Sequence, residues 1–319
     1  MVVEAGTSAA VIVLGGPTAS GKSGLALRLA QAFDGTLINA DSMQVYWDLR
    51  ILTARPMPDD EAAAPHELYG VMDAADRCSV GLWHQMARQA ADEAAGAGRL
   101  PILVGGTGFY LHAFLHGMSP IPETPSDIRA AMSERMAACG PAPLHAELRS
   151  CDPDLAAQLE PGDSQRIQRA LEVFEATGTP LSQWQRKPRE GGWEGPVLSF
   201  SLVPPREALY RLCDQRFGMM IEAGALDEVR DLMKRSLNRS LPAMRALGVP
   251  HLMAHLEGSL SLDDAMERAR TGTRRYAKRQ LTWFRNQIPD AEQAEGFGFD
   301  GAGERILEVA ARFLERISA

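Results

Sequence analysis

The sequence predicts an α/β protein: a P-loop parallel-sheet core with an inserted all-helical domain and a mainly helical C-terminal part. Through about residue 120, short apolar runs alternate with helical patterns, which is typical of a parallel sheet. After the Pro- and Ser-rich stretch at 116–127, residues 126–178 show helical patterns alone. We therefore predict a first part of the core at 1–122, a helical insertion at 123–190, and the core completion with basic C-terminal helices at 191–319.

The first predicted strand is the apolar run at residues 11–14, and a helix follows from Gly24. Between them, Gly16–Ser23 match G-x-x-x-x-G-K-[ST] in the strand–loop–helix setting of a P-loop. The backbone N–H groups of such a loop favour an anion. Lys22 adds a positive charge, and the Ser23 hydroxyl can bind Mg²⁺. The predicted anion site consists of Gly16, Pro17, Thr18, Ala19, Ser20, Gly21, Lys22 and Ser23.

This loop predicts linked phosphates, but not which molecule carries them. Proteins that use a nucleoside triphosphate usually place an acidic residue after a second strand to help hold Mg²⁺. The best such strand here, at 101–104, runs into Gly105-Gly106-Thr107-Gly108 without a carboxylate. The missing carboxylate disfavours an ordinary NTPase, and both a nucleotide and another diphosphate stay open as ligands.

Further core elements follow along the chain. The segment at 36–46 predicts a second strand that ends in a polar cluster containing Asp41. The patterns also predict strands at 63–73, 100–108 and 197–205, and helices at 80–98 and 210–229. Ligands of parallel α/β sheets bind at the carboxyl ends of the strands. We therefore expect Gly16–Ser23, Asp41–Tyr46 and Thr107–Tyr110 to surround one crevice.

Asp41 comes directly after the second strand, so its carboxylate is expected in this crevice. It could help hold Mg²⁺, or it could take a proton from an incoming nucleophile. The ordinary alternative is a turn-capping aspartate, because Ala-Asp-Ser is good turn chemistry. The position of Asp41 favours a functional role. Arg216, in the helix at 210–229, taken alone predicts only a solvated residue or an ion pair.

The strongest local charge lies in a helix predicted at 266–287. It carries one acid, Glu267, against the basic residues Arg268, Arg270, Arg274, Arg275, Lys278, Arg279 and Arg285. At about 100° per residue, a packing stripe is formed by Met266, Ala269, Thr273, Ala277, Gln280 and Phe284. Every basic residue except Arg270 lies outside this stripe. In a chain of net charge −8, such a cationic face favours a phosphate backbone as partner, and a merely solvated face is the alternative.

A second amphipathic helix is predicted at 163–178, inside the insertion. Its apolar side holds Ile167, Leu171 and Phe174. Its polar side holds Gln165, Arg166 and Arg169. Because Gln and Arg can contact both bases and phosphates, this helix is a second candidate for binding nucleic acid.

Composition sets broader bounds on the protein. A hydrophobic content of 45% and a charged content of 23% are typical of a soluble globular protein. The four cysteines have no metal-binding spacing and indicate free thiols in a reducing cytoplasm. The N-terminus lacks the basic start of a secretory signal, and no segment predicts a membrane span. We expect a cytoplasmic monomer that contacts no membrane.

Several blocks of the chain together resemble one family, the tRNA dimethylallyltransferases, also called tRNA isopentenyltransferases. The resemblance extends to about residue 287 and rests on blocks that occur in the family's order. They are "GPTASGKS" (16–23), "NADSMQVY" (39–46), "TARP" (53–56), "LVGGTGFYLHAFLHG" (103–117), "DSQRIQRALEV" (163–173), "RFGMMIEAGALDEV" (216–229), "RALG" (245–248) and "RRYAKRQLTWFRN" (274–286). The runs "VGGTGFY", in the fourth of these blocks, and "AKRQLTWFRN", in the last, are more specific than the P-loop.

The resemblance implies that the P-loop holds the diphosphate of dimethylallyl diphosphate, with Mg²⁺ as cofactor. It also implies the acceptor, the exocyclic N6 of the adenosine 3′-adjacent to the anticodon in tRNAs that read codons beginning with U. The implied reaction is a prenyl transfer that releases diphosphate. The inserted helices are then expected to hold the anticodon stem–loop, whose target base must leave the stack to react.

The resemblance also implies roles for individual residues. Asp41 matches the family's general base, Arg216 matches the arginine that neutralises the leaving diphosphate, and Thr107 helps to steer the substrates. Ser23 is the expected protein ligand of Mg²⁺. The expected tRNA contacts are Asp41, Ser42, Met43, Gln44, Thr107, Arg129, Gln165, Arg166, Ile167, Gln168, Arg169, Thr273, Arg274, Arg275, Lys278, Arg279 and Gln280.

One departure from the family pattern lies after "RALG", where the family often has Tyr-Arg and this chain has Val249-Pro250.

Three other functions compete with the implied one. An adenylate isopentenyltransferase would prenylate free AMP, but it needs neither a basic helix nor an insertion. A small-molecule kinase would use ATP, against which the missing carboxylate counts. A non-catalytic, nucleotide-gated RNA-binding protein would not need Asp41 in the crevice.

Overall fold

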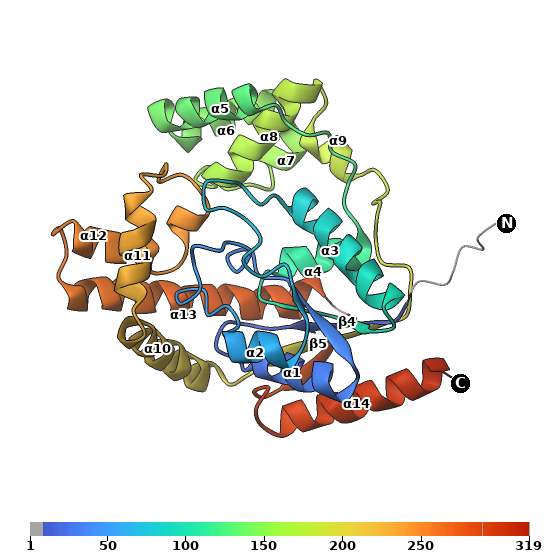
Figure 1. Cartoon of the computed structure of the whole chain (residues 1–319). Coiled ribbons are helices and arrows are strands. Elements are labelled where there is room, and N and C mark those ends of the chain that lie inside the picture. The colour runs from blue at the N-terminus through green and yellow to red at the C-terminus, as the bar shows by residue number, and fades with distance from the viewer. Residues whose placement is uncertain (1–8, 289, 319) are drawn as a thin grey trace. The chain divides into compact units, whose positions relative to one another are not determined.

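The computed structural model describes residues 9–288 and 290–318 (Figure 1). The chain forms two compact units. The first contains the chain up to Leu115 and from Trp193 onward, and the second contains His116–Gly192. The insertion predicted at 123–190 lies inside the second unit.

The first unit contains a parallel sheet that is six-stranded within the described residues, in the order β3-β2-β4-β1-β5-β6. The α/β fold with a parallel sheet is therefore confirmed. Its strands are β1 Val11–Gly15, β2 Gly35–Asn39, β3 His66–Glu67, β4 Leu100–Gly105, β5 Val197–Val203 and β6 Glu292–Glu295. Alternate residues of β1 face opposite sides of this sheet. Ile12 and Leu14 pack in one cluster of buried residues, and Val11 and Val13 pack in another.

Helices cover both sides of the sheet. Before the insertion, the first unit contains α1 Lys22–Ala32, α2 Pro58–Ala63, α3 Val80–Gly96 and α4 Gly108–His116, and the last residue of α4 belongs to the second unit. After the insertion, it contains α10 Arg206–Glu222, α11 Ala225–Lys234, α12 Val249–Leu256, α13 Leu262–Gln287 and α14 Gly301–Ser318. A 3₁₀ turn lies at Ala243–Arg245. Helices α1 and α14 lie beside each other in Figure 1 and share one buried cluster with Ile12 and Leu14. The opposite cluster contains Trp83 of α3, Phe114 of α4 and Phe284 of α13.

Two expectations about these elements were wrong in part, and one short strand was not foreseen. The third strand, predicted at 63–73, is reduced to His66–Glu67, because only these residues pair with β2 at the sheet edge. The C-terminal part also contains β6, which the polar sequence Glu-Gln-Ala-Glu did not indicate and of which Ala294 alone is buried. The helix predicted at 210–229 is broken between α10 and α11, because Gly224 adopts a left-handed φ of 101°.

The second unit consists of short helices around its own core. They are α5 Ser126–Cys139, α6 Pro141–Cys151, α7 Pro153–Ala156, α8 Ser164–Thr177 and α9 Leu181–Gln185. Asp152 caps α7, and Gly178 ends α8 with a φ of 66°. Leu148, Ile167 and Leu171 belong to its buried cluster. Across the described part of both units, every helix is too short or too polar to span a bilayer.

Candidate active site

The P-loop connects the end of β1 to the start of α1. Ala19 and Gly21 have left-handed φ values of 61° and 81°, so the loop turns tightly before the helix begins. Lys22 folds back over the loop, and its Nζ donates a hydrogen bond to the Pro17 carbonyl over 2.9 Å. Burial lowers the pKa of the Lys22 ammonium to about 8; the carboxylate of Asp41 opposes this effect, and Arg216 adds to it. The loop therefore holds a cation whose charge an anion would stabilise.

Arg216 reaches this loop from α10, although 198 residues separate it from Thr18. Its Nη1 donates to Thr18 Oγ1 over 3.3 Å. Burial lowers the pKa of the Arg216 guanidinium, while Asp41 and Cys213 act in the opposite direction. Arg216 therefore lies at the P-loop, a position that its own sequence surroundings did not indicate.

Asp41 follows β2 on a turn that its neighbours define closely. The Asp41 backbone N–H donates to Asn39 Oδ1 over 2.8 Å, and Asn39 Nδ2 donates to the Asp41 carbonyl over 3.0 Å. The Met43 N–H donates to Asp41 Oδ1 over 2.9 Å, so one carboxylate oxygen caps the turn. Within residues 9–288 and 290–318, Asp41 Oδ2 makes no hydrogen bond. The turn-capping and functional interpretations are therefore compatible, because they use different oxygens.

Thr107 stands next to this turn at the start of α4. Its Oγ1 accepts a hydrogen bond from the Ser42 N–H over 2.9 Å, and its own N–H donates to the Ala40 carbonyl over 3.1 Å. The structure therefore joins the Asp41 turn to the end of β4, as the prediction of a shared crevice requires.

Two tyrosines beside Asp41 were not foreseen as site residues. Burial raises the pKa of both the Tyr69 and the Tyr276 phenol, and the carboxylate of Asp41 raises it further. The polar side chains of Thr107 and Gln280 act on the Tyr276 pKa in the opposite direction. Tyr276 could have been found from the sequence, because it precedes Gln280 of the predicted packing stripe by one helical turn.

Gln280 connects the P-loop to the loop after β4. Its Oε1 accepts a hydrogen bond from the Thr18 N–H over 2.9 Å, and its Nε2 donates to the Gly106 carbonyl over 2.8 Å. The side chain is 5% exposed; its bond to Gly106 is buried and its bond to Thr18 is partly buried. Gln280 was expected to contact tRNA; instead, the structure commits its amide to bonds within the protein.

The glycines of "VGGTGFY" allow close approach of other elements rather than binding of a dinucleotide. A Cβ at Gly106 would lie 2.2 Å from Gln280 Nε2, and a Cβ at Gly108 would lie 2.0 Å from the Trp283 ring. Any side chain at these positions would push α13 away from the site. These close contacts explain why the block "VGGTGFY" of this chain requires glycine at positions 106 and 108.

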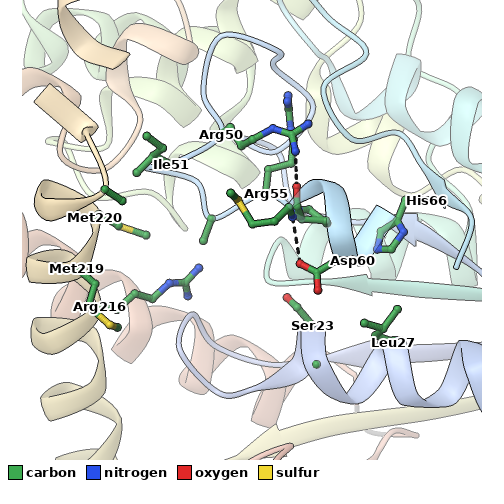
Figure 2. Close-up of a pocket in the computed structure, with 15 residues that line it drawn as sticks. Ser23, Leu27, Arg50, Ile51, Arg55, Asp60, His66, Arg216, Met219 and Met220 are labelled. Carbon is green, nitrogen blue, oxygen red and sulfur yellow. Dashed lines mark hydrogen bonds between the residues drawn. The ribbon is translucent and has the colours of Figure 1, made fainter. Parts of the chain in front are cut away.

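A cavity of about 430 Å³ adjoins the end of the P-loop at Ser23 (Figure 2). Ser23 enters it from α1 and Arg216 enters it from α10, so both predicted diphosphate contacts face this space. The apolar part of its lining is formed by Leu27, Ile51, Ala54, Met57, Met219 and Met220. The arrangement offers an anion-binding end with an apolar wall beside it, as an amphipathic small molecule requires.

Glu228 of α11 fixes one wall of this cavity. Its carboxylate accepts hydrogen bonds from the N–H groups of Arg50, Ile51 and Leu52 over 2.6, 2.7 and 2.9 Å. Gln44, an expected tRNA contact, holds the same loop, because its Nε2 donates to the carbonyls of Thr53 and Ala54. The block "TARP" therefore forms part of a braced wall.

The basic face of α13 is present, but it is smaller than predicted. Arg275, Lys278 and Arg279 are exposed and line a hollow of about 490 Å³ together with Trp283. Arg274 does not belong to this free cationic surface. Its Nη1 contacts both Asp214 oxygens over 2.8 Å and its Nη2 contacts Glu267 over 2.9 Å.

The other predicted contacts differ in exposure. Thr273 is half-buried and donates to the Ala269 carbonyl, whereas Ser42 and Met43 lie on the half-buried Asp41 turn. In place of the family's Tyr-Arg, Val249 is completely buried at the start of α12. The packing of Val249 in the core explains why this position presents no polar group to a ligand.

The second unit places its own candidates on α5 and α8. Gln165, Arg166 and Arg129 are exposed. Arg169 is half-buried; its Nη1 donates to Thr124 Oγ1 over 2.7 Å, and its pKa is lowered by burial and by neighbouring Arg129. Gln168 donates to Ser133 and Glu172, each over 2.9 Å.

Ile167 was predicted to contact tRNA, and this prediction was wrong. Its side chain is 0% exposed and packs in the core of the second unit, so it cannot reach a ligand from this position. Its role on α8 is to hold the helix, which the apolar side of the predicted amphipathic pattern already indicated.

Comparisons with known proteins find relatives along most of the chain. The model of the IPP transferase family matches residues 44–287. A Rhodospirillum rubrum protein named tRNA dimethylallyltransferase is 53% identical over 290 residues, covering 90% of this chain and 89% of that protein. A Rhodopseudomonas palustris protein of the same name is 50% identical over 303 residues, covering 92% and 93%.

Solved structures agree with these relatives. A full-length tRNA isopentenylpyrophosphate transferase of Bacillus halodurans is 31% identical with a TM-score of 0.69, and 97% of each chain is covered. A eukaryotic dimethylallyltransferase described as acting on tRNA is 28% identical with a TM-score of 0.83, covering 97% of this chain and 80% of that one. With its P-loop, its braced Asp41 turn and a family match over most of its length, this chain belongs to the IPP transferase family.

Proposed function

We propose that this protein transfers a dimethylallyl group from dimethylallyl diphosphate to N6 of the adenosine 3′-adjacent to the anticodon, in tRNAs that read codons beginning with U. The observation that carries the proposal is the convergence of two cations, Lys22 and Arg216, on the P-loop with the carboxylate of Asp41 acting on both. Relatives named tRNA dimethylallyltransferases support the same assignment. The protein would act as a monomer in the cytoplasm, where its tRNA substrates are.

The donor would bind with its diphosphate on the P-loop and its prenyl group against apolar side chains. Loop N–H groups, Lys22 and Arg216 supply the positive potential, and a diphosphate would return the pKa of Lys22 toward its ordinary value. Ile51 and Met220 are apolar walls of the adjoining cavity. This placement makes the leaving group, rather than the prenyl carbon, the most strongly held part of the donor.

Mg²⁺ fits this site as a partner of the diphosphate. Among the described residues, no three His, Cys, Asp or Glu side chains form a metal-binding group, and Ser23 at the cavity supplies a hydroxyl oxygen. Mg²⁺ commonly takes few protein ligands and completes its shell with phosphate oxygens and water. When bound, it would neutralise charge on the departing diphosphate.

The acceptor amine would approach Asp41 Oδ2, the carboxylate oxygen that the turn leaves available. A bond forms between N6 and the first prenyl carbon, and the bond from that carbon to the diphosphate oxygen breaks. The electron pair leaves with the diphosphate, and the amine proton passes to Asp41. Because an exocyclic adenine amine is a weak nucleophile, such assistance contributes about 10²–10⁴-fold.

The tRNA would dock on the cationic surface of α13. Unstacking a base costs a few kcal/mol, and phosphate contacts from Arg275, Lys278 and Arg279 would offset this cost. Trp283 adds an aromatic surface to the same hollow. Arg129, Gln165, Arg166, Gln168 and Arg169 of the second unit remain proposed contacts.

The proposal is tested with purified protein, Mg²⁺, dimethylallyl diphosphate and an unmodified tRNA transcript. We expect a prenylated adenosine in nucleoside digests analysed by mass spectrometry, at the position 3′ of the anticodon. Transfer to free AMP instead would favour the adenylate isopentenyltransferase. A requirement for ATP as the donor would favour a kinase, and tRNA binding without transfer would contradict the enzyme assignment.

Asp41→Asn is expected to cut the single-turnover rate by about 10²-fold or more, because the amide keeps an acceptor for the Met43 N–H but cannot take the amine proton. Rapid-quench measurement at saturating substrates checks the rate, and filter binding checks that the tRNA Kd changes by less than about twofold. A variant with the full rate would remove Asp41 as the general base.

Diphosphate binding is expected to weaken as the pH rises above 8, because burial leaves Lys22 with a pKa of about 8 in the free protein. The bound anion favours the protonated amine, so binding takes up a proton and the affinity falls by up to about tenfold per pH unit. Calorimetric titration with Mg²⁺ and inorganic diphosphate measures this. Lys22→Arg stays charged and should flatten the dependence; an unchanged profile would assign the titration to another group.

Gln280→Ala is expected to weaken diphosphate binding about tenfold or more, because the buried Thr18 N–H and Gly106 carbonyl lose their partner. The tRNA Kd should stay unchanged, since the amide is enclosed. Gln89→Ala on the exposed side of α3 is the matched control and should affect neither ligand, because the Gln89 amide bonds to Glu93 of its own helix. A selective loss of tRNA affinity in Gln280→Ala would instead restore the expected RNA contact.

Replacing Arg275 and Arg279 by Gln is expected to weaken tRNA binding and to lower the salt slope by about one unit per lost phosphate contact. The double variant Arg312→Gln/Arg316→Gln removes the same charge from the exposed side of α14 and serves as control. Binding measured across a salt series distinguishes the two. Equal effects of both variants would mean that net charge, and not the α13 surface, governs binding.

A further inference from the structure

The last thirty residues contact the P-loop, although they lie beyond the family match that ends at residue 287. Strand β6 joins the sheet beside β5, and the chain then turns at residues 296–300 before α14 begins at Gly301. We call residues 296–300 the C-terminal turn. At its centre, the Gly298 N–H donates a hydrogen bond to the Ser20 carbonyl of the P-loop over 2.9 Å.

The two backbones meet at van der Waals distance. A Cβ at Gly298 would lie 2.5 Å from the Gly21 carbonyl oxygen, and a Cβ at Gly21 would lie 2.7 Å from the Phe299 ring. Gly303, in the first turn of α14, is equally confined, because its Cβ would lie 2.3 Å from the Gly298 carbonyl. Glycine on both sides is therefore what permits the hydrogen bond between the turn and the loop.

The C-terminal turn is itself held at both ends. The Gly296 N–H donates to the Val203 carbonyl of β5 over 3.3 Å. Asp300 accepts from the Phe297 and Ala302 N–H groups, each over 2.8 Å. Phe297 is 8% exposed and stacks on Phe299 with ring centroids 4.9 Å apart. The contact surface offered to the P-loop is therefore ordered before any ligand arrives.

We propose that the C-terminal turn is a positioning element for the diphosphate site, acting through Gly298 on the P-loop backbone. A P-loop presents N–H groups to its anion, so the Ser20 carbonyl needs a partner elsewhere. Gly298 supplies that partner and fixes the loop in advance, which spares the ordering cost of binding. This inference rests on the proposed function, because it assumes that the loop binds a diphosphate.

The test compares Gly298→Ala with Gly301→Ala in the full-length protein. Neither residue has a left-handed φ, so an alanine at each differs only in what its methyl group meets. At 298 it meets the Gly21 carbonyl, whereas at 301 nothing lies within 4 Å. We expect Gly298→Ala to raise the Kd for inorganic diphosphate with Mg²⁺ about tenfold and the donor KM in parallel, with Gly301→Ala unchanged.

Comparing the diphosphate Kd and donor KM with the single-turnover rate and the tRNA Kd distinguishes a positioning role from a merely structural one. In Gly298→Ala, the single-turnover rate at saturating donor and the tRNA Kd should stay within about twofold of the parent protein. A lower Tm with an unchanged diphosphate Kd in the folded protein would overturn the inference. Absence of diphosphate binding in the parent protein would overturn the proposed function, and this inference with it.

Phe299→Ala provides a second variant if Gly298→Ala does not fold. The Phe299 side chain is 65% exposed, and its removal creates no clash, so the fold should tolerate it. Loss of the ring beside Gly21 is expected to weaken diphosphate binding severalfold, again with tRNA affinity unchanged. A diphosphate Kd equal to that of the parent protein would contradict the proposed role of the turn.

Discussion

The structure depends on how the backbone groups of the P-loop are satisfied. A loop that binds an anion must point its backbone N–H groups toward that anion. Its other peptide groups then need hydrogen-bond partners elsewhere, because a buried polar group without a partner destabilises the fold. Here the partners come from across the first unit. Gln280 of α13 accepts a hydrogen bond from the Thr18 N–H. Gly298 of the C-terminal turn donates to the Ser20 carbonyl, and Lys22 donates to the Pro17 carbonyl. Elements that are distant in sequence thus define the shape of a short motif.

The electrostatics of the site follow from the same enclosure. Lys22 and Arg216 are both half-buried and lie close together, so desolvation depresses the pKa of each, and Asp41 compensates only in part. Such a site is unfavourable while empty and becomes favourable when a dianion or trianion arrives. The cost of holding the cations is recovered on binding, and a ligand with several negative charges, such as the proposed diphosphate, would recover it most fully.

Sequence reasoning succeeded where the signal was local or periodic. Gly16–Ser23 needed only spacing, and the exposed cations of α13 needed only the helical repeat. It failed where a partner lies far along the chain: the Asp214 that neutralises Arg274 is 60 residues away, and the Gly106 and Thr18 groups that occupy Gln280 are 174 and 262 away. Strand β6 escaped notice because an edge strand with one buried residue has almost no pattern to detect.

The connections through Gln280 also bear on how two substrates meet. The loop after β4 carries both the Gly106 carbonyl, which bonds to Gln280, and Thr107, which bonds to the Asp41 turn. Gln280 in turn bonds to the P-loop, so a short chain of hydrogen bonds joins the proposed diphosphate site to Asp41, the proposed general base. Misplacement by about 1 Å can cost 10²-fold in rate. In the proposed reaction, a shared frame of this kind would keep the donor carbon and the acceptor nitrogen aligned, because the two halves of the site are joined by the same hydrogen bonds.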